Sequence, residues 1–273
     1  MKLNKFTFNK YLNNNFVFEN SPKIAVAVSG GPDSMALIYL INNWVKSKTI
    51  RGSVIALVVD HQIRKNSKKE TQIINKILND DKISCKILTI NKSKVIKKSM
   101  SEARYNRFEA MLKYCKKNQI LHLFLGHHKN DNLETFLMRK ISGSDIEGLA
   151  SINSNIIKDN INIIRPLLEF KKKDIYYFNK KNKIQFIEDP SNQNILYTRP
   201  ILRRYINNLK KDHYKEIENE FNIIKKNILP YNIMISEILI KNIKHIDKKK
   251  IIFDLTIFKQ LDNLIKEKII KKI

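Results

Sequence analysis

The sequence predicts an α/β protein with a doubly wound parallel sheet, followed by a small helical domain. The first observation is that short apolar runs alternate with longer stretches of helical apolar spacing between residues 24 and 141. Such alternation implies parallel strands joined by right-handed helical crossovers. The second observation is that the strand-length runs end after Arg204, where Lys-rich helical segments begin.

The first unit of the alternation is a strand, a tight loop and a helix. Residues 24–28 read IAVAV, a short β-branched run typical of a buried strand. The polar loop SGGPDS follows at once, and residues 35–45 carry apolar side chains at helical spacing. The loop is therefore expected to join the end of the strand to the start of the helix.

The same alternation continues along the chain. Strands are predicted at 53–60, 85–90 and 121–126, and helices at about 68–78, at 101–117 with Ser101 as N-cap, and at 130–141. Three polar clusters, SGGPDS, DHQIR and GHHKND, directly follow predicted strands. Because ligands of such sheets bind where the parallel strands end, the three clusters are expected to form one site.

A domain boundary is predicted near residue 206, in a weakly marked linker. The first domain comprises residues 1–205, and the small helical domain comprises residues 206–273. No strand signal comparable to those of the first domain occurs in the second. Pro230 is expected to interrupt its helices.

Composition restricts the class of protein. The formal net charge of +26 favours a polyanionic partner, although Lys, Asn and Ile dominate the whole chain, as they do in proteins from AT-rich genomes. Cys85 and Cys115 lack CxxC spacing, which argues against a disulfide framework, a zinc site or an iron–sulfur cluster. The apolar runs are too short to cross a bilayer, and no secretory signal is recognised. A cytoplasmic protein is expected, with no membrane partner and no obligate protein partner.

The strongest chemical signal is a phosphate-binding loop made of Ser29, Gly30, Gly31, Pro32, Asp33 and Ser34. The glycines let backbone N–H groups approach phosphate oxygens, and the next helix presents its positive N-terminus to the same anion. Ser29 and Ser34 are expected to donate to diphosphate, and Asp33 to hold magnesium or orient phosphate. The Walker lysine is missing, so chemistry at the γ-phosphate is not supported. The alternative is a plain strand-to-helix turn capped by Asp33.

This loop resembles the signature loop of the N-type ATP pyrophosphatases, the PP-loop superfamily. The resemblance implies a sheet of the adenine-nucleotide α-hydrolase-like type. It also implies that ATP, with Mg²⁺, is split between its α and β phosphates and that AMP is transferred to a carbonyl-type oxygen. Several substrates occur in that superfamily, so the loop indicates a class of chemistry.

Four further motifs resemble those of the tRNA(Ile)-lysidine synthases, in the order of that family. They are DHQIR at 60–64, EARYNRF at 102–108, HHKNDNLET at 127–135, and EDPSN at 188–192 followed by Tyr197, Arg199 and Arg203. The resemblance covers about residues 22–205 and implies an ATP-dependent ligase that joins L-lysine to C2 of cytidine 34 in the CAU anticodon of tRNA(Ile). The reaction passes through an adenylated cytosine and yields lysidine, AMP and diphosphate, which changes the decoded codon from AUG to AUA. Residues 206–273 would contact the tRNA.

Two arginines of the second of these motifs lie on one predicted helix face. Arg104 and Arg107 are three residues apart and are expected to hold phosphate oxygens or tRNA, with Arg107 assigned to catalysis. The alternative is a solvated face with ion pairs to Glu102 or Glu109.

A lysine substrate needs carboxylates for its ammonium groups and an acceptor for a proton. Asp131 and Glu134 are assigned to this role, although D-x-x-E at a helix start is also a capping box. His127 is preferred to His128 for the site because it precedes Asp131 by four residues. Three interpretations apply to both histidines: a general base, a ligand of phosphate, or a histidine at a strand end whose hydrogen bonds are made within the protein.

Three further groups keep two interpretations each. Asp60 and His61 either bind the adenosine part of ATP or close a turn. Residues 188–192 belong to the site or form an Asx-Pro turn. A cluster of Arg199, Arg203 and Arg204 contacts tRNA phosphate or the entrance of the site.

Three rival functions are weighed against the ligase. A tRNA thiolase would share ATP binding and tRNA adenylation, but Cys85 lies in a predicted strand and Cys115 in a predicted helix. A small-molecule synthetase of the same superfamily usually carries a glutaminase, and nothing in the chain resembles one. A basic RNA-binding protein without catalysis leaves SGGPDS unexplained.

Overall fold

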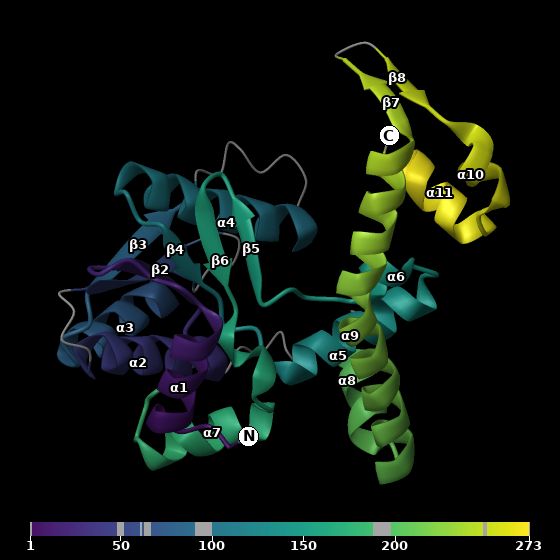
Figure 1. Cartoon of the computed structure of the whole chain (residues 1–273). Coiled ribbons are helices and arrows are strands. Elements are labelled where there is room, and N and C mark those ends of the chain that lie inside the picture. Colours follow the sequence, from purple (N-terminus) through teal and green to yellow (C-terminus); the bar gives the residue numbers. More distant parts are fainter. Residues whose placement is uncertain are drawn as a thin grey trace. The chain divides into compact units, whose positions relative to one another are not determined.

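The computed structural model describes residues 2–47, 52–60, 62, 67–90, 100–187, 198–247 and 250–272. These residues form two compact units, whose elements are drawn in Figure 1. The first unit comprises Met1–Thr135 and Ile152–Arg204, and the second comprises Phe136–Ser151 and Tyr205–Ile273. Phe136–Ser151 thus belongs to the second unit, although the sequence places it in the first domain.

A six-stranded sheet forms the centre of the first unit, in the order β3-β2-β1-β4-β6-β5. Its strands are β1 (Lys23–Val28), β2 (Ser53–Asp60), β3 (Cys85–Thr89), β4 (His122–Phe124), β5 (Asn155–Lys158) and β6 (Ile161–Ile164). Neighbouring strands pair in parallel except β5 and β6. The predicted doubly wound parallel sheet is confirmed, except that its edge strand β5 is antiparallel. β1 lies between β2 and β4, where the strand order reverses and ligands of such sheets bind.

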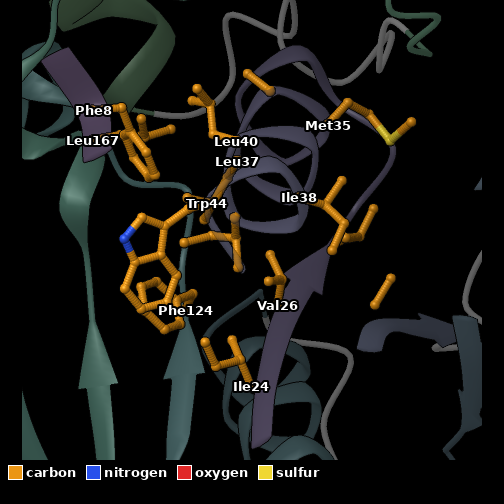
Figure 2. Packing of buried hydrophobic residues seen from close by; sticks show 14 of the residues in the cluster. Phe8, Ile24, Val26, Met35, Leu37, Ile38, Leu40, Trp44, Phe124 and Leu167 are labelled. Atoms are coloured by element: carbon orange, nitrogen blue, oxygen red, sulfur yellow. The ribbon is translucent and has the colours of Figure 1, made fainter. Parts of the chain in front are cut away.

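Helices cover both faces of this sheet. One face carries α1 (Lys5–Asn15), α2 (Pro32–Ser47), α3 (Ser67–Asp80) and α7 (Lys172–Lys181), and the other carries α4 (Met100–Lys117). Accordingly Ile24, Val26 and Val28 of β1 belong to one apolar cluster and Ala25 to the other. Figure 2 shows the first cluster around Trp44, whose indole Nε1 donates to Asn13 Oδ1 at 3.0 Å.

Several elements of the first unit were not predicted. They are α1, the antiparallel pair β5 and β6, the short 3-10 helix η2 (Pro166–Glu169) and α7. Asn4 caps α1 by accepting from the backbone N of Thr7 at 2.8 Å. The turn between β5 and β6 is Asp159-Asn160, with φ of 51° and 62°. Two consecutive residues in the left-handed region make a tight hairpin turn, and Asp and Asn are side chains that tolerate it.

The second unit is mainly helical and also contains a small strand pair. It includes α6 (Ile146–Leu149), α9 (Lys211–Asn242), β7 (Ile243–Ile246), β8 (Ile251–Phe253), α10 (Leu255–Gln260) and α11 (Asn263–Lys272). Two expectations were wrong. β7 and β8 pair, as Ile-rich runs do, and α9 continues through Pro230. An internal proline costs about 3 kcal/mol, a local loss that the other turns of a 32-residue helix offset.

Ion pairs and an aromatic contact explain why Phe136–Ser151 belongs to this unit. Lys268 Nζ pairs with Asp145 Oδ2 at 3.2 Å and with the carboxylate of Glu147. The rings of Phe136 and Phe221 lie 5.4 Å apart. Two helices, α5 (Lys129–Ile141) and α8 (Thr198–Asn208), each contribute residues to both units. None of the described helices is long and apolar enough to cross a membrane.

Candidate active site

The SGGPDS loop joins β1 to α2 and is held by its own hydrogen bonds. Ser34 Oγ accepts from the backbone N of Ser29 at 3.1 Å and donates to the carbonyl of Gly31 at 3.0 Å. Gly30 has a φ of +84°, and a Cβ at this position would lie 2.5 Å from Ile74 Cδ1. Glycine is favoured there because the backbone is left-handed, and a larger side chain would also have to displace Ile74.

Residues from the segment 179–187 also hold this loop in place. Asn179 Nδ2 of α7 donates to the carbonyl of Pro32 at 2.8 Å, and both groups are buried. Backbone N of Ile187 donates to the carbonyl of Gly30 at 2.8 Å. The carbonyls of Gly30, Gly31 and Pro32 are thus occupied within the protein. The N–H groups at the start of α2 have no carbonyl of a preceding turn to bond, so they can attract an anion.

A cavity of about 720 Å³ lies beside the loop. Its walls come from the ends of β1, β2 and β4 and from α3 and α4. Its polar lining includes Ser29, Gly31, Asp33, Ser34, Glu70, Arg104, Arg107, His127 and Arg165. The cavity thus combines a phosphate-type loop with three arginines, at the edge of the sheet where the sequence predicts a site.

Two of these arginines carry charge that burial disfavours. Partial burial of its guanidinium lowers the pKa of Arg104, although the residue as a whole is exposed, and the charge of Arg199 lowers it further. Burial together with Arg104 brings the pKa of Arg165 down to about 10. Arg165 Nη1 donates to the carbonyl of Asn153 at 2.9 Å, but its buried Nε has no partner among the described residues. Cations arranged in this way are stabilised when an anion enters.

His127 is a neutral neighbour of these cations. Arg104 Nη2 donates to His127 Nε2 at 3.1 Å, so in this arrangement the neutral imidazole carries its proton on Nδ1. Burial lowers the pKa of His127 to about 4, and although Asp131 opposes the shift, Arg165 and Arg104 add to it. At neutral pH His127 is therefore an uncharged acceptor that orients Arg104.

Asp33 and Asp131 lie on either side of His128. The backbone N of His128 donates to Asp131 Oδ2 at 3.0 Å, and the backbone N of Asp131 donates to His128 Nδ1 at 3.1 Å. This reciprocal pair caps the start of α5. Because Nδ1 of His128 accepts the bond from Asp131, the other ring nitrogen, Nε2, faces Asp33 and lies 3.8 Å from its Oδ1.

The carboxylate of Asp33 has an oxygen available for a cation. Its buried Oδ1 has no hydrogen-bond partner among the described residues, and burial raises the pKa of Asp33 although the charge of His128 opposes the shift. Within the described ranges, no group of three or more His, Cys, Asp or Glu residues could hold a metal ion. Mg²⁺ in nucleotide sites typically takes one or two carboxylates and the substrate phosphates, so Asp33 fits as its protein ligand.

Asp131 and Glu134 differ in their partners. Glu134 Oε1 accepts from Arg203 Nε at 2.7 Å, while its buried Oε2 has no partner among the described residues. Arg203 Nη2 also lies 3.5 Å from Asp131 Oδ1. The pKa of Glu134 is raised by burial, in spite of Arg203. Burial also opposes ionisation of Asp131, but the charge and backbone N–H of His128 bring its pKa below the usual value.

The structure does not bring all the predicted residues to the cavity. Asp131 and Glu134 do not line it, and they do not form a capping box with each other. Asp60 closes a turn, because its Oδ1 accepts from the backbone N of Gln62 at 3.0 Å and from Ser67 Oγ at 2.8 Å. His61, Arg64, residues 188–192 and Tyr197 lie outside the described residues.

Arg165 was missed by the sequence analysis. It directly follows β6, so the rule that polar residues after a strand line the site would have found it. That rule could not be applied because β6 was not predicted. Arg203 was expected at tRNA or at the entrance, and it contacts the buried carboxylates instead.

These features define an α/β nucleotide-binding domain with a phosphate-binding loop at the switch point of its sheet. Comparison with known families matches residues 3–210 to the PP-loop domain. The chain belongs to this family of ATP-binding domains.

Two curated relatives are similar to most of this chain. The tRNA(Ile)-lysidine synthase of Orientia tsutsugamushi is 33% identical over 214 residues, which cover 78% of this chain and 47% of the relative. The tRNA(Ile)-lysidine synthase of Rickettsia typhi is 35% identical over 229 residues, 84% of this chain and 52% of the relative. This chain therefore spans about half the length of the curated relatives it matches.

The solved structure of the U34-tRNA thiolase NcsA from Methanococcus maripaludis, with its [4Fe-4S] cluster, is also similar. Its TM-score is 0.67 at 20% identity, covering 82% of this chain and 80% of the other. At this identity the likeness shows the fold alone.

Proposed function

We propose that this chain acts as a tRNA(Ile)-lysidine synthase, which ligates L-lysine to C2 of cytidine 34 in the CAU anticodon of tRNA(Ile). One observation carries the proposal. A phosphate-binding loop and three arginines line one cavity, and Glu134, a buried carboxylate with one oxygen unpartnered among the described residues, lies on the helix that starts beside it. The first feature suits ATP and the second suits an amine substrate. The names of the curated relatives support the same reaction.

The first step adenylates the base. ATP binds with its phosphates at the loop, held by the N–H groups at the start of α2 and by Arg104, Arg107 and Arg165. Cytosine O2 attacks the α-phosphorus, the bond to the β-phosphate oxygen breaks, and diphosphate leaves with the charge that the arginines stabilise. Asp33 would hold Mg²⁺, which supplies further neutralisation of the phosphates when bound.

The second step replaces adenylate with lysine. The lysine ε-amine has a reference pKa of about 10.4 and must lose a proton before it attacks C2. Glu134 Oε2 is the proposed acceptor of that proton: Glu134 does not line the cavity, but burial raises the pKa of its carboxyl, and Oε2 has no partner among the described residues. His128 and Arg203 contact the two oxygens of Asp131 and keep this carboxylate ionised and oriented. Its negative charge contributes to binding the substrate ammonium. AMP leaves from C2, and the new bond between C2 and the lysine ε-nitrogen converts the cytidine to lysidine.

The test supplies ATP, magnesium, labelled lysine and a purified tRNA(Ile) transcript with a CAU anticodon. AMP and diphosphate are expected, never ADP, and nucleoside digestion is expected to give a lysine adduct of cytidine 34. A transcript with U34 is the matched control and should take up no lysine. A wild-type chain that forms no AMP and leaves cytidine 34 unchanged would contradict the proposal.

Sulfur transfer is the second candidate, favoured by the fold shared with the thiolase. The two cysteines argue against it. Burial raises the pKa of Cys85 to about 11 and that of Cys115 to about 12, so neither is a thiolate at neutral pH. Incorporation of labelled sulfur into the tRNA in place of lysine would establish this candidate.

A further inference from the structure

A second cavity lies on the first unit, away from the loop. It measures about 870 Å³ and is formed by the start of α1 and the exposed side of α7. Its lining includes Lys2, Lys5, Phe6, Lys173, Tyr177 and Lys181. None of its lining residues lines the active-site cavity. Figure 1 shows α1 and α7 beside each other, in the helical layer that covers the sheet face opposite α4.

The charge around this second cavity is unbalanced. Four lysines line it, and Asp174 is the one acidic residue in its lining. None of the four lysines forms an ion pair with a carboxylate among the described residues. Surface lysines are common in this chain, but here they surround a hollow, where fields of one sign add up and attract a polyanion.

Two aromatic rings stand among these lysines. The side chain of Phe6 is 75% exposed and that of Tyr177 is 66% exposed, and they come from different helices. Neither ring belongs to the apolar clusters of the sheet. An acidic peptide would satisfy the lysines and leave the rings unused, whereas a nucleic acid strand offers phosphates to the lysines and a base to the rings.

The cavity is formed without a ligand. Leu3 is buried in the first apolar cluster, and Asn4 and Thr7 exchange hydrogen bonds of 2.8 and 3.1 Å that fix the start of α1. On the other side, Phe178 of α7 is buried in the same cluster. The aromatic and basic groups are therefore carried on two anchored helices, which reduces the entropy lost on binding.

We propose that this cavity binds a single-stranded segment of RNA, with one base against Phe6 and Tyr177 and the phosphates on each side held by the lysines. The inference deepens the proposed function by adding a contact surface for the same tRNA, and it rests on that function for the identity of the RNA. Stacking on an aromatic side chain is sequence-tolerant, so this surface contributes affinity rather than selection of the anticodon.

The direct test is fluorescence of the variant Y177W titrated with the tRNA transcript. Trp44 is the single tryptophan of the chain and is buried, so it gives a constant background. Stacking of a base on the indole is expected to quench the added emission. Polyglutamate serves as a second titrant and should bind without quenching. Absence of quenching by RNA at saturation would overturn the inference, and so would equal quenching by polyglutamate.

Affinity measurements with matched variants test the two halves of the cavity. Y177A and F6A are expected to weaken tRNA binding about 5- to 100-fold, since both rings are exposed and their loss leaves the core intact. K173Q/K181Q should reduce the slope of log K against log salt by about 0.7 for each phosphate that these two lysines neutralise. The control K116Q/K117Q removes two exposed lysines from the end of α4 and should change neither quantity.

The outcomes separate this inference from the proposed function. If the wild-type chain binds tRNA but all these variants and the control behave alike, the second cavity is not an RNA site, whatever the reaction is. If Y177A weakens binding while no AMP is formed by the wild-type chain, the RNA site stands and the ligase assignment fails. With both correct, Y177A raises KM for tRNA and leaves kcat unchanged.

Discussion

The two sides of the active site differ in how their charges are balanced. On the phosphate side, the charge of Arg199 lowers the pKa of Arg104, and the charge of Arg104 lowers that of Arg165. On the carboxylate side, Arg203 pairs with Glu134, and His128 bonds Asp131. The first side gains stability only when an anion arrives, while the second is arranged before substrate binds. The two sides therefore differ in what they lack: the arginines favour an incoming phosphate, which we propose belongs to ATP, whereas the carboxylates, which we propose bind the amine, are already paired.

The strongest test of this comparison is Asp33, which connects the two sides. Asp33→Asn should reduce AMP formation at least about 100-fold, because the variant loses the charge that we propose holds Mg²⁺ beside the phosphates. Its thermal unfolding should stay equal or rise, since the native carboxylate is buried with an oxygen that lacks a partner among the described residues. Asp212→Asn, in the first turn of α9, is the control. Full turnover in D33N would remove the assignment of the loop.

On the carboxylate side, two isosteric variants separate the roles of Glu134 and Asp131. Glu134→Gln keeps an oxygen for Arg203 but loses the proton acceptor that we propose, so kcat/KM for lysine should fall about 100-fold or more. The fall for Asp131→Asn should be smaller, because Asn can still accept from the backbone N of His128. Adenylation, followed as tRNA-dependent exchange of labelled diphosphate into ATP, should persist in both. Equal losses of adenylation and lysine transfer would show that these residues only support the fold.

The phosphate side is tested at Arg165. Arg165→Met should lower kcat/KM for ATP about 10- to 100-fold, while Arg165→Lys should recover part of that loss as a point charge. Removing Arg165 also removes a repulsion on Arg104, so the free energy of unfolding should change little in spite of the missing bond to Asn153. An R165M chain that unfolds readily but keeps its turnover would indicate a structural arginine.

A smaller effect is expected from the second unit, whose contact with tRNA we propose. Lys215 and Lys226 of α9 are exposed. K215Q/K226Q should reduce the slope of log K against log salt by about 0.7 to 0.9 for each phosphate that the two lysines neutralise, with kcat unchanged. K116Q/K117Q again serves as the control. Identical slopes in all three proteins would place the tRNA contacts on other residues.

The last prediction concerns folding stability, not turnover: the pH dependence of the free energy of unfolding that His127 contributes. The folded pKa of about 4 lies below the reference value near 6.5, so between these values the unfolded chain binds more protons. Stability contributed by neutral His127 is therefore lost as pH falls through this window, at up to about 1.4 kcal/mol per pH unit. Urea unfolding should show His127→Asn losing less stability than the wild type between pH 6.5 and 4. Parallel curves would mean that His127 ionises freely.

The sequence predicted the part of the fold that local patterns encode. The runs at 24–28 and 53–60 became β1 and β2, because buried parallel strands are continuous apolar segments. The pair β5 and β6 was missed because Asn155–Lys158 and Ile161–Ile164 are short and their turn lacks glycine. β7 and β8 were missed for a similar reason, since three- and four-residue strands give little periodic signal.

The site was predictable where motifs follow strands and less so where tertiary contacts decide. Ser29, Asp33 and His127 follow β1 or β4 and line the cavity as expected. The pairing of Glu134 with Arg203 joins residues 69 positions apart, which no local pattern reveals. The same holds for His128, which folding places between Asp131, bonded to its Nδ1, and Asp33, 3.8 Å from its Nε2.

The division of the chain into two units limits where its gene can be truncated or recombined without splitting a unit. The two units meet inside α5, between Thr135 and Phe136, and inside α8, between Arg204 and Tyr205. A gene truncated at codon 206 would still encode Phe136–Ser151, stripped of Phe221 and Lys268, its partners in the second unit. The units are thus interleaved rather than appended, so recombination at one codon cannot exchange the second unit as an intact module.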